Sequence, residues 1–369
     1  MAIPIAQLHD LFLWHTTSLV VARLPHFTLA FKFDGALVAS SGVGQMTVSN
    51  GTWRAIDTYV GFDAGSQGTF VLAGGSVLCS SFLSLAQNPG STGTFWMTGG
   101  QLVITNNETA VGNRGVGQMT VSNGTWHARD VIVGYLSGAQ GTLTVAGGTN
   151  SIASTLIVGD LACTATGIVN VTSGNLFVTN AAGTATLEVR SGSFNLSGGH
   201  VEVDTIILTN SCASFSRTGG TLLYNTAVLV TNNFLADADG DGINNAWEQA
   251  AGLDPLDPAD APLDYDGDGK TNLEEFTTDT DPHDPTNYLH ISSIVVTNNN
   301  QDVLITWPVG RFFGIGLAYR VQGGSSVDSV TNDLSPFIFS GTATATNYLH
   351  VGGATNVPAR FYRVRGLID

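Results

Sequence analysis

Apolar and polar residues alternate in short segments along roughly the first two thirds of the chain. Residues 45–48 read Gln, Met, Thr, Val, and residues 142–145 read Thr, Leu, Thr, Val. Because side chains two residues apart in a strand lie on the same face, this pattern predicts β-strands with one buried face. No apolar stripe with the 3.6-residue period of a helix interrupts these segments, in which Gly, Thr and Val are frequent.

The alternating segments belong to a sequence motif of about eight residues, here called a phrase, that recurs along the chain. The phrases start at residues 44, 68, 93, 117, 141, 167, 185 and 213, so the intervals between starts are 24, 25, 24, 24, 26, 18 and 28 residues. The twelve residues GVGQMTVSNGTW occur identically at 42–53 and 115–126, three repeats apart. Most phrases are followed by a second short segment, such as VIVG or LIVG. A period in the twenties is typical of a solenoid.

Two columns of apolar residues are expected to line the interior of this solenoid. The first contains Met46, Phe70, Phe95, Met119, Leu143, Val169, Leu187 and Phe215, and the second contains Val48, Leu72, Met97, Val121, Val145, Val171, Val189 and Arg217. We interpret Arg217 either as part of a closing end that covers the core or as a slip in register. We predict a mainly β fold with a parallel β-helix over residues 42–232, whose glycines provide left-handed conformations at the corners. A propeller or a sandwich would require longer repeats or antiparallel hairpins.

The outward positions of the same strands offer little acid–base chemistry. They contain Thr47, Val71, Trp96, Thr120, Thr144, Asn170, Glu188 and Ser216. Hydrolysis of a glycoside requires two carboxylates about 5–9.5 Å apart, and a lyase requires a base with cationic groups beside it. Other acids of this region, such as Asp57, Asp63, Asp130 and Asp160, lie in predicted turns and could still converge, but nothing in the sequence pairs them. We therefore predict no catalytic residues.

Charge is concentrated in one part of the chain. The net charge is −16, yet residues 1–234 contain 10 acids and 7 bases, and residues 287–369 contain 4 acids and 5 bases. Residues 235–286 contain 15 acids and one lysine. The chain has no basic stripe that would bind the phosphate backbone of a nucleic acid, so we predict no nucleic-acid partner.

The acidic segment contains one spaced pattern twice. DADGDGINNAWE (237–248) and DYDGDGKTNLEE (264–275) both fit D-x-D-x-D-G-x5-E, and their starts are 27 residues apart. Calcium binds 6–8 oxygen atoms at about 2.3–2.6 Å, and alternate residues of a tight loop can direct their carboxylates at one ion. A solvated acidic linker would not place Gly and Glu identically in two loops. We therefore predict two Ca²⁺ sites.

Each loop provides six predicted ligands. The first site would use Asp237, Asp239, Asp241, the carbonyl of Ile243, Asn245 through a water, and Glu248. The second site would use Asp264, Asp266, Asp268, the carbonyl of Lys270, Asn272 and Glu275. Asp254, Asp279 and Asp281 either add ligands or cap turns beside proline.

The two loops resemble those of EF-hands and dockerins and, more closely, the bacterial thrombospondin type 3-like repeats, through WEQAAGLDPLDP and LEEFTTDTDPHDP. The resemblance implies short helices, expected at 244–251 and 271–277, in place of the long helices of a calcium sensor. Trp247 and Phe276 would form a core too small to be stable without metal. Residues 233–286 are thus expected to be a calcium-stiffened spacer. Cohesin binding is disfavoured, because dockerins usually have Asp where these loops end in Glu.

Residues 287–369 read as six or seven short strands separated by turn residues such as TNNNQD and GGSS, which predicts a C-terminal β-sandwich with Trp307 in its core. The segments ITW, YRVQ and FYRVR resemble fibronectin type III-like modules of bacterial exported proteins. Arg360, Arg363 and Arg365 either bind an anionic glycan or alternate along one face of a strand.

The repeats over about 42–230 resemble those of bacterial autotransporter-type and PEP-CTERM-associated surface proteins, which share the GTLTVSGG-like phrase and the LxVG segment after it. The chain departs from the latter family because it has no apolar sorting tail before its last residues, FYRVRGLID. The resemblance implies export and a place at the bacterial cell surface or outside the cell.

The N-terminus and the cysteines add little to this interpretation. Residues 1–41 are predicted to be an N-terminal cap or an incomplete leader, because no Lys or Arg precedes Arg23 and the apolar run of 12 residues before it is too short to span a bilayer. Cys79, Cys163 and Cys212 are too few and too scattered for a disulfide framework, and we predict that they are small buried residues.

Together these features predict a non-catalytic protein of the cell surface or extracellular matrix, with a β-helix stalk, a calcium-stiffened linker and an adhesive module. Its partner would be a surface glycan or another surface protein, and no membrane span is expected. The alternative is a glycan-binding accessory region, or a weak lyase or hydrolase, of a carbohydrate-active protein. Trp53, Trp96 and Trp126 either stack on sugar rings or pack a turn against the next coil.

Overall fold

The structure, a computed structural model, describes residues 18–21, 36–229, 236–310, 312–313, 318–339, 344–355 and 359–367. It divides the chain into two compact units, residues 1–230 and 231–369. The fold is mainly β, with a parallel solenoid of about eight turns, two small helices and antiparallel sheets at the C-terminal end. This confirms the predicted fold class. The predicted N-terminal segment 1–41 and the predicted boundary at residue 232 lie largely outside the described residues.

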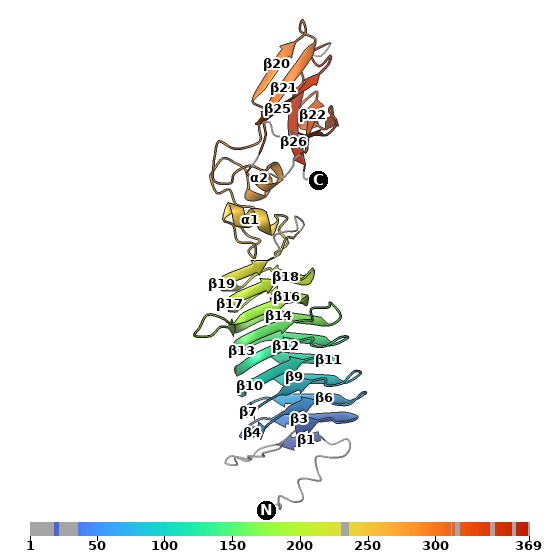
Figure 1. Cartoon of the computed structure of the whole chain (residues 1–369), viewed down its shortest axis with the longest axis vertical. Coiled ribbons are helices and arrows are strands. Elements are labelled where there is room, and N and C mark those ends of the chain that lie inside the picture. Colours follow the sequence, from blue (N-terminus) through green and yellow to red (C-terminus); the bar gives the residue numbers. More distant parts are fainter. Residues whose placement is uncertain are drawn as a thin grey trace, which may run out of the picture. The chain divides into compact units, whose positions relative to one another are not determined.

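The solenoid is built from three parallel ladders, whose strands are stacked in chain order in Figure 1. The first ladder contains β1 (Ser18–Val21), β3 (Val43–Val48), β6 (Gln67–Leu72), β9 (Thr92–Met97), β11 (Val116–Val121), the starts of β13 (Gln140–Val158) and β14 (Thr166–Val178), β16 (Ser191–Leu196) and β18 (Cys212–Arg217).

The second ladder contains β4 (Thr52–Ala55), β7 (Ser76–Cys79), the starts of β10 (Gln101–Val111) and β12 (Thr125–Val133), later parts of β13 and β14, and the starts of β17 (His200–Leu208) and β19 (Thr221–Leu229). The third contains β2 (Ala36–Val38), β5 (Thr58–Val60), β8 (Leu83–Leu85), the ends of β10, β12 and β13, β15 (Thr186–Val189), and the ends of β17 and β19.

The interior contains the predicted apolar columns. Met46, Phe70, Phe95, Met119, Leu143 and Val169 pair in sequence along the first ladder, and all are buried. The rings of Phe70 and Phe95 stack with centroids 5.0 Å apart. Trp126 is fully buried in the second ladder, and Trp53 is nearly so, so both pack inside the solenoid. Like side chains thus cover each other from one coil to the next, which keeps water out of the core.

The prediction was wrong for one repeat, the phrase at 185–192. Leu187 and Val189 belong to β15, which pairs with the end of β13 in the third ladder. The eighth strand of the first ladder is β16, where Phe194 pairs with Val169 and Leu196 with Val171. Counted from Gly192, the last two intervals become 25 and 21 residues, close to the others. Both kinds of strand alternate in the same way, so alternation alone does not distinguish them.

Closely packed glycines explain why six of the eight phrases start with this residue. A Cβ on Gly141 would lie 2.1 Å from the carbonyl oxygen of Val111 and 2.2 Å from the backbone nitrogen of Gly134. Gly134, which ends the VIVG segment, has a φ of 72°. The glycine that turns the corner and the glycine that starts the next phrase therefore approach too closely for any side chain, and the turn needs a left-handed residue. Because of this contact, the glycine that starts a phrase and the glycine that ends a VIVG-type segment recur with the same period.

The last coil keeps its register. β18 pairs with β16 without interruption, and Arg217 lies opposite Leu196. The interpretation of Arg217 as a slip in register is therefore wrong, and its position in the last coil fits the closing end.

The cysteine prediction was right for Cys79, which is buried, and wrong for the other two. Cys163 and Cys212 form a disulfide across 49 residues, or two coils of the solenoid. Both lie in exposed positions, Cys163 in the loop between β13 and β14 and Cys212 at the start of β18. Asn210 donates a hydrogen bond from Nδ2 to the carbonyl oxygen of Leu161 at 3.1 Å, which holds the loop beside the later coil.

The second unit begins with two short helices, α1 (Asn245–Ala251) and α2 (Asn272–Thr278), close to the predicted ranges. They contribute Trp247 and Phe276 to a small core that also contains Ile243, Ala251, Leu253 and Ala261. Leu273 and Phe312 pack against this core. Among the described residues, no helix is long and apolar enough to cross a membrane.

Two antiparallel sheets form the rest of this unit. The first contains β20 (Ser293–Thr297), β21 (Asp302–Pro308) and β25 (Ala345–His350). The second contains β22 (Ala318–Gly324), β23 (Asn332–Asp333), β24 (Ile338–Phe339) and β26 (Phe361–Leu367), and a 3₁₀ turn (η2, Val327–Ser329) precedes β23. Val303, Ile305, Trp307, Tyr319 and Val321 form the core, so Trp307 lies where the sequence predicts it.

Candidate metal sites

The two acidic loops have the same internal hydrogen bonds. In the first, the Asp237 carboxylate accepts the backbone N–H groups of Gly240 (2.7 Å) and Gly242 (3.0 Å). In the second, Asp264 accepts those of Gly267 (2.7 Å) and Gly269 (2.9 Å) in the same way. The glycines bend each loop sharply, with φ values between 80° and 97°. The repeated sequence pattern therefore produces a repeated loop structure.

The next two aspartates of each loop use one carboxylate oxygen for the backbone and keep the other unpaired. Asp239 Oδ1 accepts the N–H of Asp241 (3.2 Å), and Asp241 Oδ1 accepts that of Ile243 (2.7 Å). Their Oδ2 atoms are buried and have no hydrogen-bond partner among the described residues. Asp266 and Asp268 repeat this arrangement in the second loop. An oxygen that is fixed, buried and unpaired is suited to bind an ion.

Each helix places a buried glutamate against its loop. The side chain of Asn244 caps α1 by accepting the N–H of Trp247, and Thr271 and Glu274 form a capping box at the start of α2. These caps fix the helix starts and thereby the positions of Glu248 and Glu275. Both glutamates have an exposed fraction of 0%, and none of their four carboxylate oxygens has a partner among the described residues.

The electrostatics of the segment require a cation or protons. Burial raises the pKa of Glu248 to about 10, with further increases from the neighbouring Asp239 and Asp241. Burial also raises the pKa of Glu275 and of Asp239 to about 8. Burying carboxylates without a partner is costly, and no described basic side chain is ion-paired with them. A divalent ion would compensate this charge.

The carboxylates are close enough to share ions. Asp237, Asp239 and Asp241 each provide an oxygen within 4.8 Å of the others, and so do Asp264, Asp266 and Asp268. Two oxygens bound at about 2.4 Å to one ion are at most about 4.8 Å apart. The donors are all oxygen atoms, which suits a hard cation such as Ca²⁺, and the residues present therefore fit the ion that the sequence predicts.

The other predicted ligands lie in the loops as follows. Asn245 accepts the N–H of Ala238 on its Oδ1 (2.8 Å), which ties the helix start back to the loop. Asn272 is fully buried and donates from Nδ2 to the carbonyl of Asp260 (2.8 Å), while its Oδ1 has no described partner. Ile243 and Lys270 occupy the seventh positions, and Ile243 also contributes its side chain to the small core.

Three acids for which the sequence left two roles open hold backbone groups. Asp254 accepts the N–H of Leu256 (3.1 Å), and Asp281 accepts that of His283 (3.0 Å). Asp279 has a left-handed backbone (φ 52°) and accepts the N–H of Phe313 (2.7 Å) on its side chain. These contacts favour the turn-capping role. Asp260, which the pattern does not contain, is the carboxylate that sequence reasoning missed, because it lies 12 residues beyond Glu248.

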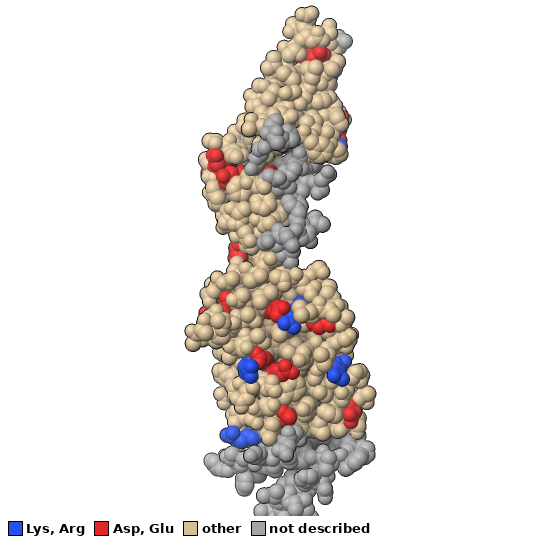
Figure 2. Space-filling view, in the orientation of Figure 1, with Lys and Arg blue, Asp and Glu red and all other residues tan. Residues whose placement is uncertain are grey.

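On the solenoid, Asp130 lies in β12 and not in a turn as predicted, and the structure gives it an acidic neighbour that the sequence did not indicate. Asp130 lies opposite Glu108 in adjacent strands, and burial, together with the Asp130 charge, raises the pKa of Glu108. Asp130 also forms an ion pair with Arg129 (3.1 Å). Figure 2 shows charged side chains of both signs scattered over the visible face of the solenoid among mostly uncharged residues. Glu188, expected on the first ladder, lies instead on the third and forms an ion pair with Arg190 (2.7 Å).

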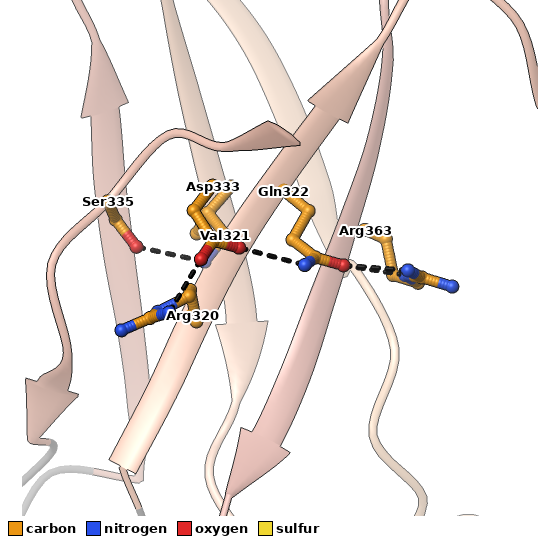
Figure 3. Close-up of polar contacts among 6 residues, drawn as sticks. All are labelled: Arg320, Val321, Gln322, Asp333, Ser335 and Arg363. Atoms are coloured by element: carbon orange, nitrogen blue, oxygen red, sulfur yellow. Dashed lines mark hydrogen bonds and ion pairs between the residues drawn. The ribbon is translucent and has the colours of Figure 1, made fainter. Parts of the chain in front are cut away.

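Arg363 is used within the sandwich. It donates to Gln322 Oε1 (2.7 Å) and to the carbonyl of Val330 (3.0 Å). Gln322 in turn donates to Asp333, which is paired with Arg320, and Figure 3 shows these side chains in one row across β22. The guanidinium of Arg363 is therefore engaged by neutral acceptors of its own fold, which favours its structural role over binding of an anion.

No family model matches the chain, and no curated protein or solved structure matches it either.

Proposed function

We propose that the segment containing α1 and α2 binds two calcium ions, and that the protein is a non-catalytic component of the bacterial cell surface or extracellular matrix. In this proposal the solenoid is a stalk, the calcium-loaded segment is a stiff linker, and the sandwich is an adhesive module for a surface glycan or another surface protein. The observation that carries the calcium part is the pair Glu248 and Glu275, fully buried and without partners beside aspartate loops.

Packing supports the role of calcium as a stiffener. The core around Trp247 is small, and a core of this size gains much of its stability from bound metal. Phe312, which precedes β22, packs on Trp247 with ring centroids 5.4 Å apart. Its N–H donates to the carbonyl of Asp279 at the end of α2 (2.8 Å). Calcium that orders the two helices would thereby also fix this contact with the sandwich.

Two features support export. The disulfide between Cys163 and Cys212 is typical of oxidising compartments outside the cytosol. Calcium loops of modest affinity are saturated by the millimolar calcium found outside cells. The resemblance of the loops to thrombospondin type 3-like repeats, and of the coils to exported surface proteins, agrees with both features.

The alternative, a glycan-binding accessory region or a weak hydrolase, would be supported by the carboxylate pair Glu108 and Asp130. Hydrolysis of a glycoside requires two carboxylates, and these two lie opposite each other in adjacent strands. Asp130 is ion-paired with Arg129 and accepts a hydrogen bond from Thr155 (3.0 Å), contacts that also hold the strands together. We therefore favour the non-catalytic proposal.

Isothermal titration calorimetry of the whole chain with CaCl₂ tests the proposal. We expect two bound ions per chain with affinities between about 10⁻⁷ and 10⁻³ M, the range of sensor and extracellular calcium loops. Glu248→Gln and Glu275→Gln, which keep the shape but remove the charge, should each weaken one of the two sites. Absence of calcium binding down to millimolar affinity would contradict the proposal.

A further inference from the structure

Asp260 lies between α1 and α2, outside both D-x-D-x-D-G-x5-E patterns. We propose that Asp260 is a ligand of the first calcium site and reaches it from outside the loop. This inference rests on the proposed calcium-binding function. It adds one ligand to the first site and predicts that the two sites differ in calcium affinity.

The geometry places Asp260 at the first site. Oxygens of Asp241, Glu248 and Asp260 all lie within 4.8 Å of one another, which is the span that a single calcium ion allows. Asp241 belongs to this group and also to the group formed by the loop aspartates. The Asp260 carboxylate therefore adjoins the same ion-binding space as the predicted ligands.

The two oxygens of Asp260 have the same division of roles as those of the loop aspartates. Oδ2 accepts the backbone N–H of Asp254 (2.9 Å), which fixes the carboxylate in place. Oδ1 is buried and has no hydrogen-bond partner among the described residues, and the exposed fraction of the whole residue is only 6%. A buried oxygen that is held rigidly and left unpaired beside Glu248 is explained by an ion that both would bind.

The start of α2 holds the backbone of Asp260 from the other side. Asn272 donates from Nδ2 to the carbonyl of Asp260 (2.8 Å), and the N–H of Leu273 donates to the carbonyl of Ala261 (3.0 Å). Asn272 is itself a predicted residue of the second loop. The position of Asp260 is thus set by Asp254 and by the second loop, although its carboxylate lies beside Asp241 and Glu248 of the first.

The second site has no equivalent among the described residues. There the acids that lie within 4.8 Å of one another are the three loop aspartates Asp264, Asp266 and Asp268. Because calcium affinity rises with the number of charged ligands and the rigidity of the site, the first site should bind calcium more tightly than the second.

Calorimetry on the full chain, stripped of metal and titrated with CaCl₂, provides the test. We expect two unequal sites in the natural protein, and in Asp260→Asn a loss of at least about tenfold in the affinity of the tighter site, with the weaker site changed by less than about twofold. Asp257→Asn removes the same charge three residues away, and it should leave both affinities within about twofold. Unchanged affinities in Asp260→Asn would overturn the inference while leaving the proposed function intact, whereas a natural protein that binds no calcium would overturn both.

Thermal melts separate ligation from a purely structural role for the hydrogen bond to Asp254. Asn can still accept that hydrogen bond, so Asp260→Asn should melt at the same or a higher temperature than the natural protein in a chelator, because one buried negative charge is removed. In the presence of calcium, Asp260→Asn should have a lower melting temperature than the natural protein. A variant that melts lower in chelator and shows the full increase on adding calcium would contradict the inference.

Discussion

The solenoid interior contains stacked apolar side chains, whereas the small core around Trp247 is bordered by carboxylates that no described side chain neutralises. In the solenoid, Phe70, Phe95 and Met119 cover one another in adjacent coils, and each is fully buried. Beside the small core, Glu248 and Glu275 are equally buried but unpaired among the described residues. One region excludes water with its own side chains, and the other buries carboxylates that an ion would have to compensate.

If the proposed function is correct, this difference makes the stability of one part of the chain independent of calcium and that of another part dependent on it. A coil of the solenoid gains stability from its two neighbours, so its core grows with the number of repeats. The segment around α1 and α2 is not built from stacked coils, and its buried charges oppose folding unless they are compensated.

Removing calcium should change the stability of the protein most, and it should destabilise residues 231–369 alone. If two sites are each saturated about 1,000-fold above their Kd, binding contributes about 8 kcal/mol, which corresponds to a decrease of about 25–30 °C in the melting temperature of residues 231–369. Differential scanning calorimetry with and without EDTA, followed by limited proteolysis, would measure it. The transition of the solenoid should stay where it is, and a common shift of both transitions would contradict the comparison.

Truncating one stacked ring should have the next largest effect, in the other region. Phe95→Ala removes a fully buried ring from the first ladder, and we expect a loss of about 3–5 kcal/mol in the free energy of unfolding of the solenoid. Trp96→Ala is the matched control, because the adjacent Trp96 points outward and is 44% exposed; its effect should stay within about 0.5 kcal/mol. Denaturant melts followed by circular dichroism would compare the variants, and neither should change calcium affinity.

A change of pH should have the smallest effect on stability of the three changes, and it should act on the region that contains the buried glutamates. Without calcium, burial raises the pKa of Glu248 to about 10 and that of Glu275 to about 8, above the values near 4.3 expected in an unfolded chain. At a pH between the pKa of a glutamate in the unfolded chain and its raised pKa in the folded protein, the folded state holds a proton that the unfolded state lacks. The free energy of unfolding therefore decreases as pH rises through this range.

In EDTA, lowering the pH from 7 to 6 should therefore stabilise residues 231–369 by about 1.4 kcal/mol for each such proton. With calcium the trend should reverse, because protons compete with the ion for the same carboxylates. Thermal melts at the two pH values, with and without calcium, would measure both signs. A calcium-free protein that loses stability on acidification through this range would contradict the assignment of unpaired buried glutamates.

Much of the fold could be predicted because the solenoid repeats its local rules. Alternation identifies the strands, and the period identifies the coils, so the columns from Met46 to Val169 are buried as expected. The phrase at 185–192 was assigned to the wrong ladder because ATLEVRSG alternates like the strands of both ladders. Local pattern is degenerate there, and only pairing with β13 decides the position.

In the candidate metal sites too, local sequence patterns predicted some residues and missed others. Asp237, Asp264 and their loop partners were recognisable because a tight loop brings residues of fixed spacing together. Asp260 was missed because it approaches Glu248 through the packing of α1 on α2, which no local spacing records. The disulfide was missed for a related reason, since Cys163 and Cys212 meet only when two coils have been stacked.

The sequence by itself determined the parallel coils, the two aspartate loops and the short helices after them, because each depends on contacts between residues close in the chain or one period apart. The tertiary structure decided which strand joins which ladder, which cysteines meet, and which carboxylates are buried without a partner. These outcomes depend on distances between segments far apart in sequence, and those distances are set by the packing of whole coils and helices.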